Sequence, residues 1–279
     1  MPLPTPASEH YTAQQGLIVA TLALVRAGWR RMNADDLDGS WALLAPLMAR
    51  IVSRAQLAAA RNGAGYVGPT LDALGQSVKP EALVRVTAFV GTASDGRPLG
   101  SLLDGAKVVA KQSQSLEVGG QWLEMVTHTQ VADAARQSAS VDMFTRPGVG
   151  YVRAVNPPCC QRCAVLAGRF YKVESFLRHP QCDCFMIPST VAQPGGFGQS
   201  VEPDQIKDLT KAQRKAIDDG ADMNRVINSH RAGKRSKDGM TTTELAKRGQ
   251  RRLTPEAIYR VSASRDEALK RLRDNGYIL

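Results

Sequence analysis

The sequence predicts a mostly α-helical protein with a small α+β module, an N-terminal helical hairpin and a basic C-terminal extension. Three observations lead to this prediction. Apolar residues recur at helical spacing through the first 61 residues, all five cysteines lie between Cys159 and Cys184, and eight lysines and arginines fall within residues 231–252. Aromatic residues make up only 5% of the 279 residues, so the core must consist mainly of Ala, Leu and Val, which favours helices.

The first 61 residues are predicted to form the helical hairpin. Residues 1–7 contain three prolines and are expected to be an unstructured arm, with Ser8 as the N-cap of the first helix. The apolar stripe of that helix comprises Ile18, Leu22, Val25, Trp29 and Met32. The second helix is expected to run from Ser40 to about Arg61, and Pro46 either kinks it or marks its start. Its stripe comprises Trp41, Leu44, Met48, Ile51 and Ala55. The faces that carry the two tryptophans are therefore expected to pack together.

The middle of the chain is predicted to form shorter elements. Residues 66–100 mix short helices with Gly-rich turns, and two further helices are predicted at 101–113 and 121–138. His128 lies in the second of these and is given no role. The pattern changes after residue 146, and residues 151–155 are predicted to form a strand.

The last third of the chain is polar and basic. Residues 205–228 are predicted to form a polar helix, and a last helix is expected to begin after Thr254, which is its predicted N-cap. We divide the chain into an N-terminal helical domain at 1–145 and a cysteine-rich module at 146–200. Residues 201–279 then hold the polar helix, a basic tether and the C-terminal helix.

The formal net charge of +10 indicates an acidic partner such as nucleic acid, although such a charge also keeps a protein soluble. No stretch is expected to span a membrane, because the best candidate, Gly16–Val25, is about half the required length. Basic residues follow that stretch and none precedes it, which is the reverse of a signal peptide. We therefore expect a soluble, unsecreted protein with no membrane partner.

The cysteines form two pairs with metal-ligand spacing. Cys160 and Cys163 form a CxxC that one tight turn can present to one ion, and Cys182 and Cys184 form a CxC whose side chains point the same way in an extended strand. Two soft pairs separated by 18 residues can close a tetrahedral zinc site. His179 lies three residues before the CxC and could replace one cysteine. The α+β module is therefore expected to be zinc-stapled.

Other interpretations of the cysteines remain open. Cys159 could pair with Cys163 as a CxxxC, although Cys160 ranks higher. A dithiol redox centre would need the CxxC to follow a strand and open a helix in a thioredoxin-like unit, which the sequence does not indicate. The cysteines could also be reduced and metal-free. A catalytic zinc needs an open coordination position and a carboxylate base, and Glu174 and Asp183 are nearby, but no HExxH or HxE pattern is present.

Two segments resemble a known family. Residues 156–163 read Asn-Pro-Pro-Cys-Cys-Gln-Arg-Cys, a Leu-Ala-Gly and an aromatic pair follow, and residues 179–184 read His-Pro-Gln-Cys-Asp-Cys. This pattern resembles the signature of MuF-like phage minor head proteins, and is most similar to the minor capsid proteins of actinobacterial tailed phages. Leu-Thr-Pro-Glu-Ala-Ile-Tyr-Arg at 253–260 and the closing Gly-Tyr-Ile-Leu are similar to their C-terminal ends. The match covers about residues 151–188 and the last 30. The chain departs from the family in the doubled Cys159-Cys160 and in Asp183, where the family often has Arg.

The resemblance implies a structural protein of the phage virion with no enzymatic activity. Such a protein is made in the host bacterial cytoplasm and lies in the capsid interior or at the head-tail junction, in few copies near the portal. Its expected partners are the portal protein, the major capsid protein, or both, on which the N-terminal helices would dock. Some members of the family are associated with packaged DNA.

The basic tether is expected to bind double-stranded DNA without reading its sequence, because lysines and arginines neutralise phosphates irrespective of the bases. The eight basic residues are Arg231, Lys234, Arg235, Lys237, Lys247, Arg248, Arg251 and Arg252. A solvated charge run with no partner is the simpler interpretation. For the whole chain, the alternative function is a host zinc-ribbon nucleic-acid-binding regulator, followed by a metal-dependent nuclease or toxin.

Overall fold

A computed structural model describes residues 3–172, 179–190, 201–229, 240–241, 252–253 and 261–274. Its internal contacts divide the chain into two compact units. The first contains Met1–Ala154 and Gly168–Gly198, and the second contains Val155–Ala167 and Gln199–Leu279. Most described residues are helical and a small antiparallel sheet is present, so the mostly α-helical class is confirmed. The three-part division at residues 145 and 200 stays a prediction.

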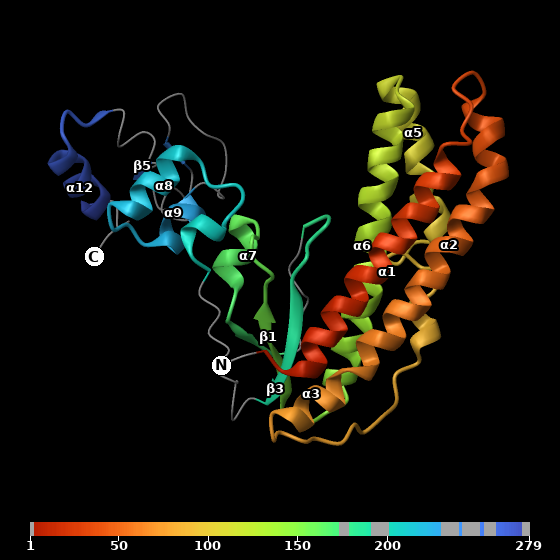
Figure 1. Cartoon of the computed structure of the whole chain (residues 1–279), viewed down its shortest axis with the longest axis horizontal. Coiled ribbons are helices and arrows are strands. Elements are labelled where there is room, and N and C mark those ends of the chain that lie inside the picture. The colour runs from red at the N-terminus through yellow and green to blue at the C-terminus, as the bar shows by residue number, and fades with distance from the viewer. Residues whose placement is uncertain are drawn as a thin grey trace. The chain divides into compact units, whose positions relative to one another are not determined.

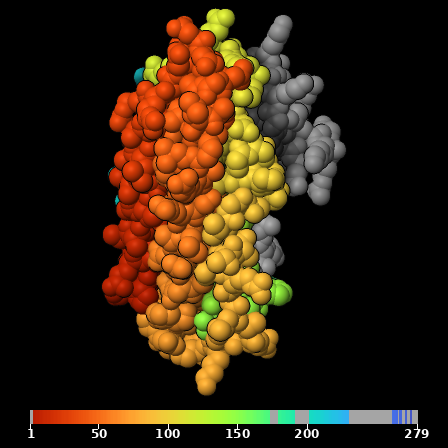
Figure 2. All heavy atoms as spheres, turned by 90° about the vertical axis from the view of Figure 1, so that its right-hand side faces the viewer, coloured from red at the N-terminus to blue at the C-terminus, as the bar shows by residue number. Residues whose placement is uncertain are grey.

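A helical bundle forms the larger part of the first unit. The helices α1 (Thr5–Trp29), α2 (Leu37–Gly65) and α6 (Leu116–Phe144) run side by side, and α5 (Gly105–Ser113) packs on α6 (Figure 1). Figure 2 shows α1 in red lying along α2 in orange. A close approach of α2 and α6 requires glycine at position 63, because a Cβ there would lie 2.2 Å from a backbone carbonyl oxygen of α6.

The predicted N-terminal hairpin is confirmed in its packing. The rings of Trp29 and Trp41 meet edge-to-face with their centroids 5.9 Å apart, a geometry that aromatic pairs favour. Their indole nitrogens donate hydrogen bonds to the carbonyl oxygen of Leu116 at 2.8 Å and to the carboxylate of Asp104 at 2.7 Å. Both tryptophans are therefore core residues that join the hairpin to the helices that follow it.

The predicted starts of both hairpin helices are wrong. Helix α1 begins at Thr5 rather than after Ser8, with Pro6 in its first turn. Proline suits this place because the first turn has no partner for its missing N–H and its φ is already helical. Helix α2 begins at Leu37 rather than at Ser40, because the side chain of Asp36 accepts a hydrogen bond from the N–H of Gly39 at 2.9 Å.

The helical run Leu37–Ala73 is long and apolar enough to cross a membrane by length and composition alone, contrary to the expectation that no stretch would be. Its apolar stripe, which includes Met48 and Val52 at 0% exposure, packs into the core of the bundle. Pro46, Arg50 and Arg54 lie on its exposed side. The core helix of a soluble bundle has the same features. Pro46 lies well inside α2, so it does not mark the start of the helix.

Residues 66–100 are confirmed as a series of short elements, which are α3 (Val67–Ala73), the 3-10 turn η1 (Val86–Phe89) and the start of α4 (Leu99–Leu103). The single helix predicted at 101–113 is wrong, because the chain divides at Asp104 into the end of α4 and the separate helix α5. Helix α6 is longer than its predicted span of 121–138. It begins where the side chain of Ser115 accepts a hydrogen bond from the N–H of Val118 at 3.3 Å.

A three-stranded antiparallel sheet completes the first unit. Its order is β2 (Phe170–Tyr171), β1 (Val149–Ala154) and β3 (Phe185–Thr190), so the strand predicted at 151–155 is the central one. Every residue of β1 is buried. The hydroxyl of Tyr66 in the bundle donates to the carbonyl oxygen of Met186 in β3 at 2.8 Å, which fixes the sheet against the helices.

The second unit contains short helices. They are α7 (Gln161–Leu166), the 3-10 turn η2 (Pro203–Gln205), α8 (Lys211–Asp218) and α9 (Met223–Ser229). The single polar helix predicted at 205–228 is therefore wrong. The chain stops α8 with Gly220, whose φ of +93° is a conformation that only glycine adopts readily.

The C-terminal residues of the second unit are described in part. Strands β4 (Met240–Thr241) and β5 (Arg252–Leu253) pair antiparallel, and α12 covers Arg265–Asp274. The predicted start of the last helix, directly after Thr254, lies outside the described residues.

Candidate metal centre

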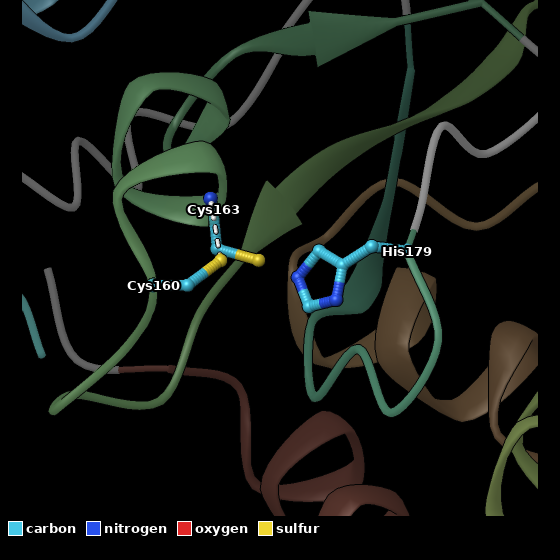
Figure 3. A group of neighbouring side chains, drawn as sticks. All are labelled: Cys160, Cys163 and His179. Carbon is cyan, nitrogen blue, oxygen red and sulfur yellow. Dashed lines mark hydrogen bonds between the residues drawn. The ribbon is translucent and has the colours of Figure 1, made fainter. Parts of the chain in front are cut away.

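The side chains of the two cysteine pairs and His179 come together in the structure. The side chains form two groups, and within each group the ligand atoms all lie within 4.8 Å of one another. One group holds Cys160, Cys163 and His179, and the other holds Cys163, Cys182 and Cys184. Figure 3 shows the first group, with the thiol of Cys163 turned toward the imidazole ring of His179. None of the five cysteines is in a disulfide. The cluster could hold a metal ion.

The CxxC pair is held at the start of α7. Cys160 is the N-cap of this helix, and its sulfur accepts a hydrogen bond from the N–H of Cys163 at 3.4 Å (Figure 3). The next N–H, that of Gln161, donates to the carboxylate of Asp208 at 2.7 Å. Cys163 is buried and Cys160 is half-buried. A single helical turn therefore presents both thiols on one side.

The local context of the CxxC corrects one expectation. The motif does follow a strand, β1, and does open a helix, α7, as redox dithiols do. The sheet is nevertheless a three-stranded antiparallel one, with β1 between β2 and β3. The strand-to-helix context is therefore present without the remainder of a thioredoxin-like unit in the described residues.

The CxC pair is held from the bundle. Arg136 of α6 donates to the carbonyl oxygen of Cys182, and also to that of Cys184 at 2.9 Å. The hydroxyl of Thr129, also on α6, accepts a hydrogen bond from the N–H of Gln181 at 3.2 Å. Gln181 has a φ of +57°, so the chain turns sharply just before the pair. These contacts fix the backbone from which both buried thiols project.

The guanidinium groups of Arg136 and Arg153 both lie beside the CxC. The guanidinium of Arg153 in β1 donates to the sulfur of Cys182 at 3.7 Å, and the residue is only 2% exposed. The guanidinium of Arg136 also pairs with the carboxylate of Asp133 at 3.3 Å, and that carboxylate is 2% exposed. Positive charge in a buried setting favours thiolate, the form in which cysteine binds metal.

A second histidine, His128 of α6, lies near the CxC. Burial and, to a lesser extent, the charge of Arg136 lower its pKa, while Asp183 and Cys182 act in the opposite direction. Its Nε2 atom is buried with no hydrogen-bond partner among the described residues. It belongs to neither group of ligand atoms, so it stays without an assigned role.

The donor set fits a soft or borderline divalent metal. Thiolates and imidazole are the ligands that structural zinc sites use, at tetrahedral geometry. Cys159 belongs to neither group. Its backbone instead forms hydrogen bonds within the second unit, donating to the carbonyl oxygen of Gln205 at 3.0 Å and accepting from the N–H of Lys207 at 2.9 Å. Its neighbour Cys160 is the cysteine grouped with Cys163, and its role as a ligand stays a prediction.

Sequence reasoning missed Arg136 and Arg153. The signal for Arg153 was present, because it is a single charged residue in the apolar run Tyr151–Val155 that predicted a strand. A buried charge needs a partner, and such a residue is rarely buried without a reason. Arg136 carried no comparable signal, because its sequence surroundings are those of an ordinary helix surface.

The predicted nucleic-acid-binding residues lie almost entirely outside the described residues. These are Arg231, Lys234, Arg235, Lys237, Lys247, Arg248 and Arg251. Arg252 is placed by its backbone in β5, and its side chain is outside the description. The DNA interface therefore stays a prediction. Of the two carboxylates considered for a catalytic site, Glu174 is also outside, and Asp183 accepts a hydrogen bond from the hydroxyl of Tyr11 at 3.3 Å.

Comparisons of this chain with protein-family models, with curated proteins and with solved structures found no match. The resemblance to a phage family therefore rests on the quoted motifs alone. The chemistry of the site rests on the geometry of its own side chains.

Proposed function

We propose that the chain is a structural protein of a phage virion, a minor capsid component of head morphogenesis near the portal, with a zinc ion stapling its cysteine module. The observation that carries the zinc part is the convergence of two cysteine pairs and His179, none of them in a disulfide. The similarity of residues 151–188 and of the C-terminal residues to MuF-like proteins supports the virion part. No enzymatic activity is proposed.

The proposed zinc ligands are Cys160, Cys163, Cys182 and Cys184. Four thiolates close a structural site, whereas a catalytic site would keep an open position for water. His179 lies beside the CxxC and is the alternative fourth ligand. The binding free energy of the ion would contribute directly to folding, which suits a module whose strand β2 has only two residues.

Metal analysis tests the zinc proposal directly. Protein purified under reducing conditions without chelator is expected to carry about one zinc per chain. Cys163→Ser and Cys184→Ser are expected to lose it. Cys159→Ser is the matched control, because Cys159 is buried like them but belongs to neither ligand group, and it is expected to keep the ion. Absence of zinc from the unaltered protein would contradict the proposal.

Purified phage particles test the virion proposal. The protein is expected to copurify with heads in few copies, and to cosediment with purified portal or major capsid protein. Recovery only as a free monomer that binds one DNA sequence tightly would favour the host zinc-ribbon regulator instead.

The DNA part of the proposal rests on the basic tether at residues 231–252. Binding is expected to be weak, independent of sequence and steeply salt-dependent, since each neutralised phosphate contributes about −0.9 to the log–log slope. A chain that ends at Ser229 is expected to lose most of this binding while keeping its zinc. Neutralising Arg248, Arg251 and Arg252 together is expected to flatten the slope by up to about three units. Equal DNA binding by the truncated chain would leave the tether as a solvated linker.

A further inference from the structure

We infer that Arg153 is a positioning residue of the proposed metal centre, which donates an N–H···S hydrogen bond to the metal-bound sulfur of Cys182 and draws negative charge away from it. This inference rests on the proposed zinc site and deepens it. In this role Arg153, a residue of the sheet, controls how strongly the Cys182 thiolate holds the metal and how readily that thiolate reacts.

The backbone of Arg153 is fixed on both sides. Arg153 lies opposite Met186 where β1 pairs with β3. On the other edge of the strand, its N–H donates to the carbonyl oxygen of Arg169 at 3.0 Å and its carbonyl accepts from the N–H of Gly168 at 2.8 Å. The direction of the side chain is therefore set by the sheet, and the Nη2 atom arrives 3.7 Å from the sulfur of Cys182.

The burial of Arg153 gives this contact its energetic weight. A guanidinium that is 2% exposed has lost nearly all its water, so it is retained only where acceptors and negative charge meet it. A neutral thiol is a weak acceptor, but a metal-bound thiolate is an anion and accepts a charge-assisted hydrogen bond. Either ligand set, four thiolates or three thiolates and an imidazole, leaves zinc with a net negative charge that a cation stabilises.

Arg136 provides a contrast within the same surroundings. Its side chain is also little exposed, at 11%, and it also contacts the CxC. Its hydrogen bonds go to the carbonyl oxygens of Cys182 and Cys184, and its charge is paired with Asp133. Arg136 therefore orients the backbone that carries the thiols, whereas Arg153 acts on the electrons of one sulfur.

Cobalt substitution separates these two effects. In Co²⁺-loaded protein, the sulfur-to-cobalt charge-transfer band reports the energy of the thiolate lone pairs, which a hydrogen bond lowers. Arg153→Met is expected to shift this band to lower energy and to weaken zinc binding about 10- to 100-fold, as losses of groups behind a ligand do. Arg153→Lys keeps the charge and is expected to restore part of both. Arg136→Met is the matched control, expected to weaken binding without shifting the band.

Each outcome of this experiment decides one question. Absence of a cobalt–thiolate band from the unaltered protein would overturn the proposed metal centre itself. A normal band in the unaltered protein that Arg153→Met leaves in place, with only an affinity loss like that of Arg136→Met, would overturn the inference alone and leave Arg153 as a packing residue.

A second measurement uses the unaltered chain and does not depend on how the variants fold. Zinc-loaded protein is treated briefly with N-ethylmaleimide, and the modified cysteines are located by mass spectrometry. Cys184 is the internal comparison, because it is 3% exposed and Cys182 is 2% exposed. A hydrogen-bonded thiolate is a poorer nucleophile, so Cys184 is expected to react before Cys182. Earlier modification of Cys182 would overturn the inference.

Discussion

The helical bundle and the cysteine module are held together by different interactions. The bundle buries large apolar side chains such as Met48 and Leu123, both at 0% exposure, along helices of 25 to 29 residues. The module has strands of two to six residues and buries the charged side chain of Arg153 among its cysteines. The hydrophobic effect is the main source of stability for the bundle, whereas the module buries a guanidinium whose loss of water must be offset by negative charge and acceptors nearby.

Removal of the metal is expected to cause the largest loss of stability, and this loss is expected in the cysteine module only. Structural zinc contributes roughly 10–16 kcal/mol of apparent binding free energy in small zinc domains, so a chelator is expected to unfold the cysteine module. The bundle keeps its apolar core and is expected to remain helical. Calorimetry and circular dichroism with and without chelator check this. Simultaneous loss of both regions would show that the bundle depends on the metal too.

Leu123→Ala is the reciprocal change, because it is expected to destabilise the bundle and leave the metal centre intact. Leu123 is fully buried in α6, so its truncation leaves a cavity and costs about 2–5 kcal/mol of unfolding free energy. Zinc content is expected to stay at that of the unaltered protein. Chemical denaturation measures the first effect and metal analysis the second. Loss of zinc together with stability would break the proposed independence of the two regions.

Acidification is expected to destabilise the bundle through His10. Its ring stacks on Tyr66 with centroids 3.8 Å apart, and burial lowers its pKa to about 4 from 6.5. Between these values the unfolded chain binds a proton that the folded chain does not, so stability falls as the pH drops from about 6.5 to 4. The loss reaches about 3 kcal/mol at the lower end.

His10→Phe keeps the stacked ring and removes the titrating group, so it isolates this effect. Its unfolding free energy is expected to change less with pH across the same range than that of the unaltered protein. Denaturation midpoints at several pH values measure both chains. Identical pH profiles for the two proteins would contradict the assignment of the effect to His10.

His179→Ala is expected to have the smallest effect, and it sharpens the description of the module. If the four cysteines are the ligands, the imidazole lies behind them, and its loss weakens zinc binding only about 10- to 100-fold. Cys160→Ser is the comparison, because Cys160 and His179 both lie beside Cys163. Competition with a chromophoric chelator measures both affinities. An equal loss in the two variants would make His179 the fourth ligand.

The predictable parts of the fold depended on short-range patterns. The stripes through Trp29 and Trp41 predicted the hairpin because helical periodicity places residues four and three apart on one face. The helix ends were harder, because the caps that decide them, such as Asp36, compete with equally suitable neighbours such as Ser40. The predicted polar helix at 205–228 failed for a similar reason, since one left-handed glycine divides it.

Local sequence patterns were enough to predict the helical class, the central strand and the two cysteine pairs, because each depends on residues only a few positions apart. The surroundings of the CxC, in contrast, became visible only in the folded chain. Arg136 and Arg153 lie 46 and 29 residues from Cys182, and no local pattern links them to it. Long-range contacts of this kind depend on how the sheet packs on the bundle. A buried cation reaches its partner only after that packing has formed.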